Sequence, residues 1–395
     1  MDMSSVPGFR FAGVPLSGVK GRVGMLFSEE PDTAGAALYT QNDFKAAPVI
    51  VSQRQDQLST RKRGILVNSG CANAFTGRGG YADADACLKA MARKLEVPAE
   101  ECYIASTGVI GQRLEMGAMS KAIDELQLDE KPESALNFVH SILTTDTKPK
   151  IAVVDFILDG KTVHLAGCIK GAGMIQPNLA TMLCFIITDV KIKQTLLRRS
   201  LASAAQETLN SITVDSDTST NDTVFILANG RAGNAIISDE DERYQSFTKK
   251  LQELMQILAL ELIADAEGAT KRLTVEVLGA KTSEAAHQAA FSIANSPLVK
   301  TAFFGEQLNW GRIVMAVGKT MIGADPETLD VAINAIPVVV KGEPQNEEIC
   351  RRAEATLKQK EISIQVNLNA GPASKRVWTC DYSLEYIKIN ANYIS

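Results

Sequence analysis

The chain has 395 residues, of which 45% are hydrophobic and 22% charged, so it has the composition of a globular protein with two or three domains. Its net charge of −5 argues against binding to nucleic acid or to an anionic membrane surface. There is no apolar segment of about 18 residues, no signal peptide and no C-x-x-C pair among seven scattered cysteines, so we expect a reduced, cytoplasmic protein.

The first half of the chain alternates strands with helices. Short strands are predicted at residues 23–27, 36–39, 49–52, 64–68 and 102–106. Apolar spacing predicts helices at 81–95 and over most of 117–145, with a break at 129–132. Strands resume at 151–158 and 162–166 and lead to a glycine-rich loop.

The second half follows a different order. A strand is predicted at 182–188, and amphipathic helices follow at 191–210, 244–264 and 284–294. From Ile313 onwards strand patterns dominate, with strands at 331–340, 362–368, 376–380 and 386–390 and one helix at 347–358. Strands and helices do not alternate regularly, which indicates an α/β or α+β fold with mixed sheets.

Histidines are scarce, which restricts the chemistry. His140 and His287 lie in helical patterns and His164 in a strand pattern, and none has a cysteine or histidine at metal-ligand spacing. We expect surface or satisfied core positions for all three histidines. No metal site is predicted, and acid–base chemistry must come from other groups.

The junction between Ala180 and Thr181 is the most informative feature. A threonine that follows a small residue, between a glycine-rich loop and a strand, can attack the carbonyl of the preceding peptide bond. Cleavage would leave Thr181 as a new N-terminus, with a hydroxyl nucleophile and its own amine as base. The junction therefore predicts a self-processing N-terminal-nucleophile enzyme.

Several polar loops follow predicted strands. Thr107 and Gly108 can present a hydroxyl and a backbone N–H to one point, as an oxyanion hole requires, or they can form a plain turn. The run 214–223 holds three carboxylates, but it lacks the spacing of a calcium loop, so we expect a polar network that fixes a loop near the active site.

Two charged residues have both a functional and an ordinary interpretation. Lys170 can bind a substrate carboxylate or lie solvated in a loop, and Glu267 can bind a substrate ammonium or end a helix. The segment 309–312 is typical of a site edge or an interface. Gly171 and Gly173 lack the third glycine of a dinucleotide fingerprint, and no P-loop is present.

Together these segments resemble the ornithine acetyltransferase family, the bifunctional glutamate N-acetyltransferases of arginine biosynthesis. The matching segments occur in family order at 68–77, 106–111, 144–147, 170–175, 180–183, 217–222, 267–271 and 309–312. The resemblance covers the chain from about residue 8 to 395. It implies an N-terminal-nucleophile-like architecture of mixed sheets sandwiched with helices, with a smaller C-terminal α/β lobe from about 280 to 395.

The resemblance also implies a division of the chain and a reaction. Cleavage between Ala180 and Thr181 would give an α chain (1–180) and a β chain (181–395) that stay associated, in a dimer of αβ units or larger. Thr181 would accept an acetyl group from N2-acetyl-L-ornithine and pass it to L-glutamate in a ping-pong reaction. Thr107 and Gly108 would form the oxyanion hole, and no cofactor is expected beyond acetyl-CoA as a second donor substrate.

The resemblance further implies the substrate-binding residues, which are Thr144 or Thr145, Lys170, Thr181, Glu267, Asn390 and Ser395. The chain departs from the family pattern at Ser395, where threonine is usual, at Ala266 and Ser216, where glycine is common, and at 307–308, where Asp-Pro is usual. These departures bear on substrate preference.

Two other classes of function stay open. One is an N-terminal-nucleophile aminopeptidase or amidase, which would share Thr181 but pass the acyl group to water. The other is a structural paralogue with an unprocessed chain.

Overall fold

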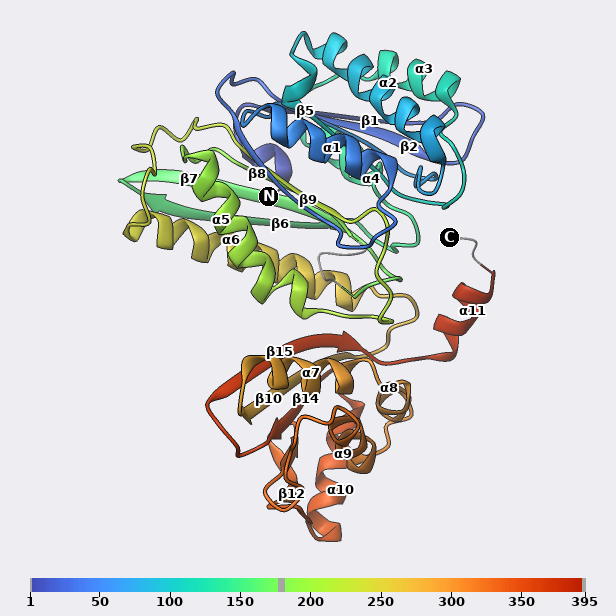
Figure 1. Ribbon diagram of the computed structural model, residues 1–395, viewed down its shortest axis with the longest axis vertical. Helices are drawn as coiled ribbons and strands as arrows, with labels where there is room; N and C mark the ends of the chain where they lie inside the picture. Colours follow the sequence, from blue (N-terminus) through green and yellow to red (C-terminus); the bar gives the residue numbers. More distant parts are fainter. Residues whose placement is uncertain (1, 177–181, 393–395) are drawn as a thin grey trace. The chain divides into compact units, whose positions relative to one another are not determined.

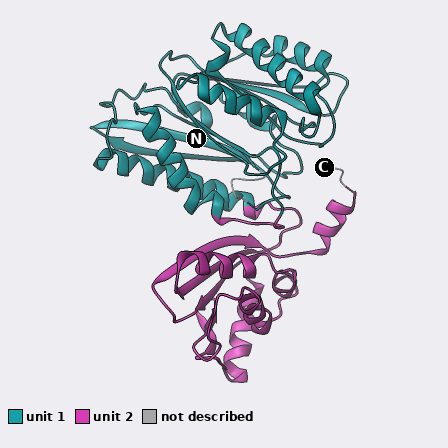
Figure 2. Ribbon diagram, viewed as in Figure 1, with its two compact units in different colours: residues 1–210, 217–262, 394–395 teal, residues 211–216, 263–393 magenta. Residues whose placement is uncertain are grey.

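The structure is a computed structural model that describes residues 2–176 and 182–392 (Figure 1). The chain divides into two compact units (Figure 2). The first consists of residues 1–210, 217–262 and 394–395, and the second consists of residues 211–216 and 263–393. By its contacts the short segment 211–216 belongs to the second unit, although the chain on either side of it belongs to the first.

The first unit contains two mixed sheets, with strand orders β1-β2-β4-β5 and β3-β9-β8-β7-β6. Their strands are β1 (Phe9–Pro15), β2 (Arg22–Ser28), β3 (Ala34–Tyr39), β4 (Gly64–Asn68), β5 (Cys102–Ser106), β6 (Lys150–Leu158), β7 (Lys161–Lys170), β8 (Leu183–Thr188) and β9 (Thr223–Ala228). The pairs β4–β5 and β8–β9 are parallel, and the other neighbours are antiparallel.

Helices of this unit cover the outer faces of the two sheets, except for residues Pro132–His140, which pack between the sheets, where Phe138 contacts Phe11 and Phe185. The helices are α1 (Ala47–Leu58), α2 (Gly77–Leu95), α3 (Met116–Glu125), α4 (Pro132–His140), α5 (Gln194–Glu207) and α6 (Glu242–Ala264). Between the sheets lies a buried core in which the rings of Tyr103 and Phe225 stack with centroids 4.2 Å apart. Helices α2 and α3 pack on the four-stranded sheet, and α6 packs against Gly167 of the five-stranded sheet (Figure 1). The predicted sandwich of mixed sheets and helices is confirmed.

The second unit is built on one mixed sheet with strand order β13-β12-β11-β14-β10-β15. The strands are β10 (Arg272–Ala280), β11 (Asp330–Ile333), β12 (Ile336–Val340), β13 (Glu343–Pro344), β14 (Glu361–Asn367) and β15 (Ala373–Cys380). Its helices are α7 (Ser283–Ala294), α8 (Pro297–Phe304), α9 (Trp310–Gly318), α10 (Glu347–Ala355) and α11 (Leu384–Asn392). Apolar residues of α7 and α9 pack with those of β10 and β14 in a core of their own.

Two predicted strands are helices. Residues 49–52 lie inside α1, where Pro48 occupies the first helical turn and Ser52 Oγ donates to the carbonyl oxygen of Ile104 at 2.7 Å. Residues 386–390 lie inside α11, which begins where Ser383 Oγ accepts hydrogen bonds from the N–H groups of Glu385 and Tyr386. In both cases a start signal and tertiary contacts override the β-branched residues that suggested a strand.

Two further expectations for the C-terminal part need correction. The predicted strand at 331–340 is two strands, β11 and β12, because Asn334 and Ala335 adopt positive φ angles of 48° and 63° and turn the chain back as a hairpin. Ile313, where strand patterns were expected to begin, lies in α9. The other predicted strands and helices are confirmed, with shifts at their ends.

Candidate functional site

One end of the five-stranded sheet collects the charged residues that the sequence singles out in the first unit. Lys170 ends β7 and pairs with Leu183 at the start of β8, which in turn pairs with Thr223 at the start of β9. Met182 and Asp222, which immediately precede these two strands, therefore lie at the same end. Lys150 begins β6 and is also at this end, since it pairs with Ile169.

A direct contact joins Thr107 to Lys170. The ammonium Nζ of Lys170 lies 3.1 Å from Thr107 Oγ1, and the two residues are only 7% and 8% exposed. A lysine ammonium can only donate, so the threonine oxygen is the acceptor in this bond. The hydroxyl hydrogen of Thr107 is thereby left for another acceptor, in a buried place where a hydrogen bond to a negative oxygen is strong.

Gly108 occupies a position that excludes side chains. Its φ is +133°, and a Cβ atom there would lie 2.2 Å from the carbonyl carbon of Gly70. The backbone of the loop after β5 thus passes directly over the loop after β4, which only glycine permits. A hydrogen bond holds the neighbouring residue in place, because the backbone N–H of Thr107 donates to the carbonyl oxygen of Asn68 at 2.9 Å.

The polar run 214–223 contributes the network that the sequence predicts. Asn221 is buried, and its Nδ2 donates to the carbonyl oxygens of Ala72 at 2.7 Å and Ser106 at 2.8 Å. Ser106 Oγ in turn donates to Asn68 Oδ1 at 2.6 Å. The loops that carry Gly70 and Thr107 are therefore tied to the start of β9.

A buried ion pair between Asp146 and Lys150 lies near Lys170. Lys150 Nζ lies 2.5 Å from Asp146 Oδ1, and neither side chain is exposed. Asp146 also accepts the backbone N–H of Gly171 at 2.8 Å and that of Thr144 at 3.1 Å. Burial alone would raise the pKa of Asp146, but the charges of Lys170 and Lys150 and the N–H of Gly171 together hold this pKa below its usual value.

Asp222 is the second buried carboxyl at this end of the sheet. It is 2% exposed and accepts a hydrogen bond from the backbone N–H of Met182. Burial raises its pKa well above the usual value, although the nearby charge of Lys170 acts in the opposite direction. The pKa shifts therefore favour the ionised form of Asp146 and the protonated form of Asp222, and the charge of Lys170 acts on both.

The second unit brings Glu267 and Asn390 together. Glu267 is 8% exposed, and its Oε2 accepts a hydrogen bond from Asn390 Nδ2 at 2.9 Å. The start of α11 approaches closely because Gly268 has a φ of +68° and a Cβ there would lie 2.4 Å from the backbone nitrogen of Tyr386. Glu267 is thus a buried residue with a partly buried hydrogen bond to Asn390, and is not a solvated residue after a helix.

The predicted site residues fall into three groups. Thr107, Gly108 and Lys170 gather in the first unit, where Thr144 is linked to Lys170 through Asp146 and Thr145 is half-buried beside it. Glu267 and Asn390 form a pair in the second unit. The remaining predictions, Ala180, Thr181 and Ser395, lie outside the described residues.

Three residues of this arrangement were missed or given no individual role: Asp146, Lys150 and Asp222. Lys150 had a signal in the sequence, because it shares its parity along β6 with the apolar residues Ala152 and Val154, all on the buried face. A lysine in register with a buried apolar face needs a buried partner. Asp146 stands four residues earlier and provides it.

Other sequence expectations concern metals, histidines and interfaces. Within residues 2–176 and 182–392 no cluster of three histidine, cysteine or carboxylate residues could hold a metal ion. No described helix is long and apolar enough to cross a membrane. His164 lies on β7 and its Nδ1 is 2.9 Å from Asp155 Oδ1. Arg312 donates to the carbonyl oxygen of Leu298 at 2.6 Å and so contacts α8.

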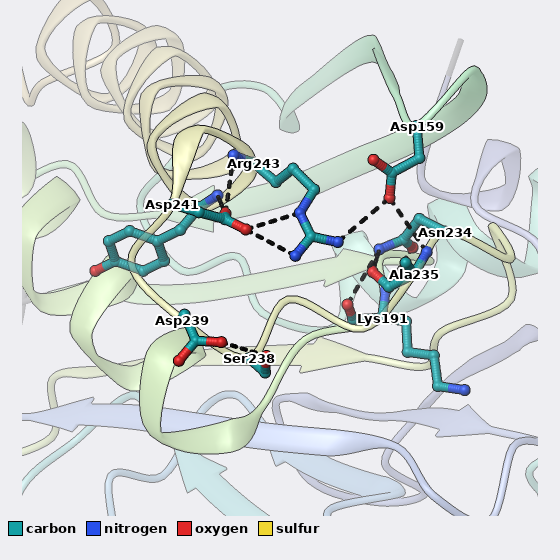
Figure 3. Close-up of polar contacts among 9 residues, drawn as sticks. Asp159, Lys191, Asn234, Ala235, Ser238, Asp239, Asp241 and Arg243 are labelled. Atoms are coloured by element: carbon teal, nitrogen blue, oxygen red, sulfur yellow. Dashed lines mark hydrogen bonds and ion pairs between the residues drawn. The ribbon is translucent and has the colours of Figure 1, made fainter.

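The opposite end of the five-stranded sheet carries a different polar network (Figure 3). Arg243, at the start of α6, donates from two nitrogens to Asp241 Oδ2 at 2.9 and 2.7 Å and lies 3.6 Å from Asp159 Oδ2. Asn234 binds both the N–H and the carbonyl of Lys191 beside it. The side chains of Arg243, Asp159 and Asp241 are about one-third exposed, and their bonds fix loops at the sheet end.

Comparison with known proteins gives one consistent family. The model of the ArgJ family matches residues 11–395. The arginine biosynthesis bifunctional protein ArgJ of Desulfotalea psychrophila is 41% identical over 99% of this chain and 100% of its own length. That of Oceanobacillus iheyensis is 40% identical over 99% of this chain and 96% of its own.

A solved structure of the arginine biosynthesis bifunctional protein ArgJ from Bacillus halodurans agrees with this result. It is 40% identical, has a TM-score of 0.51, and matches 53% of this chain and 98% of the solved chain. The family model and the two sequence relatives match nearly the whole chain, and the family model includes every segment that carries the candidate site. The protein is therefore an enzyme of the ArgJ family of arginine biosynthesis.

Proposed function

We propose that the protein cleaves itself between Ala180 and Thr181 and then transfers an acetyl group from N2-acetyl-L-ornithine to L-glutamate through an acetyl-Thr181 ester. The observation that carries this proposal is the hydrogen bond from Lys170 Nζ to Thr107 Oγ1. This bond uses Thr107 Oγ1 as an acceptor and leaves the hydroxyl hydrogen to be donated to an oxyanion, as acyl transfer requires.

The reaction follows from the residues in their roles. After cleavage the α-amine of Thr181, with a reference pKa of about 7.7–8.0, takes the proton of the Thr181 hydroxyl as it attacks the acetyl carbonyl. The negative oxygen of the tetrahedral intermediate accepts hydrogen bonds from Thr107 and from the backbone of Gly108. Ornithine leaves, and the amine of glutamate then attacks the ester through the same intermediate in reverse.

The charged residues of the proposal suit different charged groups of the substrates. Lys170 is a buried cation and suits a substrate carboxylate, and Thr144 or Thr145 lies beside the carboxylate that supports it. Glu267, Asn390 and the terminal Ser395 suit the amine of ornithine or glutamate, since a buried carboxylate with an amide partner attracts an ammonium group. No cofactor takes part, and acetyl-CoA is a candidate second acetyl donor.

The division into an α chain (1–180) and a β chain (181–395) is part of the same proposal, as is a C-terminal lobe from about 280. The solved Bacillus halodurans chain supports this division. The match uses 53% of 395 residues, about 209, and covers 98% of the solved chain, so that chain is close in length to residues 181–395. We further propose a dimer of αβ units or larger in the cytoplasm, in keeping with free thiols at all seven cysteines.

The test combines a denaturing gel with a transfer assay. We expect two bands of about half the full mass, and acetyl release from N-acetylornithine that depends on added glutamate. Equal release without an acceptor would indicate an amidase instead, and a single full-length band would indicate a structural paralogue. A second assay, with acetyl-CoA as the only donor, tests the additional substrate.

A further inference from the structure

Asp146 lies beside two buried lysines, and each lysine has a different contact. Lys150 Nζ is 2.5 Å from Asp146 Oδ1, and neither side chain has exposed surface. Lys170 Nζ is 3.1 Å from the hydroxyl oxygen of Thr107. Burial raises the pKa of Asp146, but the charges of Lys170 and Lys150 help to outweigh it, so both ammonium groups are close enough to stabilise the carboxylate. One carboxylate therefore attracts two cations.

The backbone holds this carboxylate in a fixed position. Asp146 Oδ1 also accepts the N–H of Gly171 at 2.8 Å, and Oδ2 accepts the N–H of Thr144 at 3.1 Å. Gly171 directly follows Lys170, the last residue of β7, and has a φ of +149°. A lysine ammonium, in contrast, stands on a flexible four-carbon stem. A change in the charge around Asp146 will therefore be met by movement of a lysine side chain and not of the carboxylate.

The contacts of the two lysines differ in charge. Lys150 pairs with a negative carboxylate, whereas Lys170 donates to a neutral hydroxyl oxygen. The attraction between opposite charges is strong in a buried place, because little water screens it. If Lys150 did not neutralise Asp146, the carboxylate would attract the ammonium of Lys170 away from Thr107.

We propose that Lys150 is a positioning residue for substrate recognition. By neutralising Asp146 it keeps the ammonium of Lys170 at Thr107, where this ammonium can bind the carboxylate of an N-acetylated amino acid. The inference rests on the proposed function, in which Lys170 binds that carboxylate. It deepens that function, because it assigns part of the substrate specificity to a residue that acts through another.

This role predicts a change in specificity as well as a loss of activity. If Lys170 moves toward Asp146, a substrate with an α-carboxylate loses its cation, whereas a substrate with a neutral carboxamide at the same place loses much less. A purely structural defect lowers the amount of active enzyme and affects both substrates equally. The ratio of the two kcat/KM values does not depend on the enzyme concentration, so it reports the position of Lys170.

Lys62 provides a matched control. It is a lysine of the same unit with no exposed surface, and its Nζ donates to the carbonyl oxygen of Gln55 at 3.2 Å. Lys62 stands two residues before β4, and the other end of that strand, Asn68, pairs with Ser106 next to Thr107. Lys62→Met therefore removes a buried cation without changing the charges beside Lys170.

The experiment compares N2-acetyl-L-ornithine with its α-carboxamide as acetyl donors to glutamate, in self-cleaved wild-type and variant enzymes. We expect the wild type to prefer the carboxylate, and Lys150→Met to lower that preference about tenfold, which lies within the usual coupling between residues of one polar network. Lys62→Met should keep the wild-type ratio. Asp146→Asn/Lys150→Met should recover most of the preference, because the neutral amide no longer attracts Lys170. A thermal melt of each enzyme reports folding.

The ratio in each variant decides the inference. A Lys150→Met enzyme with the wild-type ratio would overturn it, as would a wild type with no preference for the carboxylate. A double variant as unselective as Lys150→Met would also overturn it, because the charge of Asp146 would then not be what moves Lys170. If Lys150→Met does not fold or does not cleave itself, the double variant decides: a ratio close to that of the wild type supports the inference, and a clearly lower one contradicts it. Failure of the proposed function looks different, because the wild-type enzyme would then transfer no acetyl group to glutamate.

Discussion

The two ends of the five-stranded sheet hold charged residues in opposite ways. Where β8 and β9 begin, Asp146 and Lys150 have no exposed side-chain surface, and Lys170 and Asp222 are nearly as buried. Where β8 and β9 end, the side chain of Arg243 is 30% exposed and its partner carboxylates are similarly accessible (Figure 3). The same sheet therefore has a buried charged cluster at one end and a solvent-accessible charged cluster at the other.

The difference shows what each cluster can do. A buried ion is costly to desolvate, and a buried pair is rarely better for stability than an apolar pair of the same size. In return, its charges act strongly on each other and on anything bound nearby, because little water screens them. The exposed cluster is screened, so its bonds fix loops without strong effects on pKa or reactivity.

The pKa of an aspartate illustrates the same contrast. Asp241 has a lowered pKa because of its hydrogen bond from Arg243 and the backbone N–H of Tyr244. Asp146 also has a lowered pKa, but its lysines and the N–H of Gly171 first have to outweigh its burial. Asp222 has only the opposing charge of Lys170 and two backbone N–H groups, and burial prevails.

The largest expected effect is at the proposed nucleophile. Thr181→Ala should abolish both self-cleavage and acetyl transfer, because no hydroxyl remains to attack either carbonyl. A denaturing gel and the transfer assay measure the two losses separately. A Thr181→Ala chain that is cleaved and active would contradict the mechanism.

Thr107 tests the buried end next. Thr107→Ala should lower kcat about 100- to 1000-fold, which is the usual loss when one oxyanion donor is removed. Thr107→Ser retains the hydroxyl and is the matched control, with an expected loss well below that. Steady-state kinetics on cleaved enzyme measure the effect, and a Thr107→Ala enzyme with wild-type kcat would exclude this residue from the oxyanion hole.

The ion pair between Asp146 and Lys150 tests how the buried cluster affects the free energy of unfolding. Lys150→Met should lower the free energy of unfolding by about 3–5 kcal/mol, because it leaves the carboxylate of Asp146 buried with less compensation. The double variant Asp146→Leu/Lys150→Met removes both charges and should recover much of that loss. Urea unfolding of the three proteins measures the difference, and equal stabilities of the single variant and the wild type would show that the pair is not buried in solution.

The pH dependence of stability offers a smaller test. Asp146 has a folded pKa below its unfolded value of about 3.9, so it stabilises the fold above that pH and the contribution is lost as the pH falls through the folded pKa. The slope of unfolding free energy against pH should therefore be shallower below pH 4 in Asp146→Asn than in the wild type. Parallel slopes in urea titrations at several pH values would argue against the lowered pKa.

Much of this arrangement follows from local sequence. The hydroxyl and glycine at 107–108, the cation at 170 and the network at 214–223 all stand beside strands whose apolar runs are unmistakable. Their functional grouping came from the order of several motifs, since each motif alone also fits a turn or a cap. The strand parity of Lys150 was readable as well, but its significance depends on knowing that the face is buried.

Other features depended on contacts that local patterns do not contain. The β-branched residues at 49–51 favour a strand, and only the packing of α1 against β5 makes a helix the better solution. The residues at 386–390 form α11 because Ser383 caps it, which places Asn390 against Glu267. The burial of Asp222 Oδ2 without a hydrogen-bond partner among the described residues is a three-dimensional property with no sequence signal at all.

The smallest effect belongs to the exposed end and completes the comparison. Arg243→Ala removes the bonds to Asp241 and the weaker contact with Asp159, both at side chains about one-third exposed. We expect a change in unfolding free energy of at most about 1 kcal/mol, shrinking as salt is added, and no change in cleavage or transfer. Urea unfolding at low and high salt measures it. A decrease in unfolding free energy as large as that of Lys150→Met would contradict the comparison. It would mean that solvent exposure does not determine how much each charged cluster stabilises the fold.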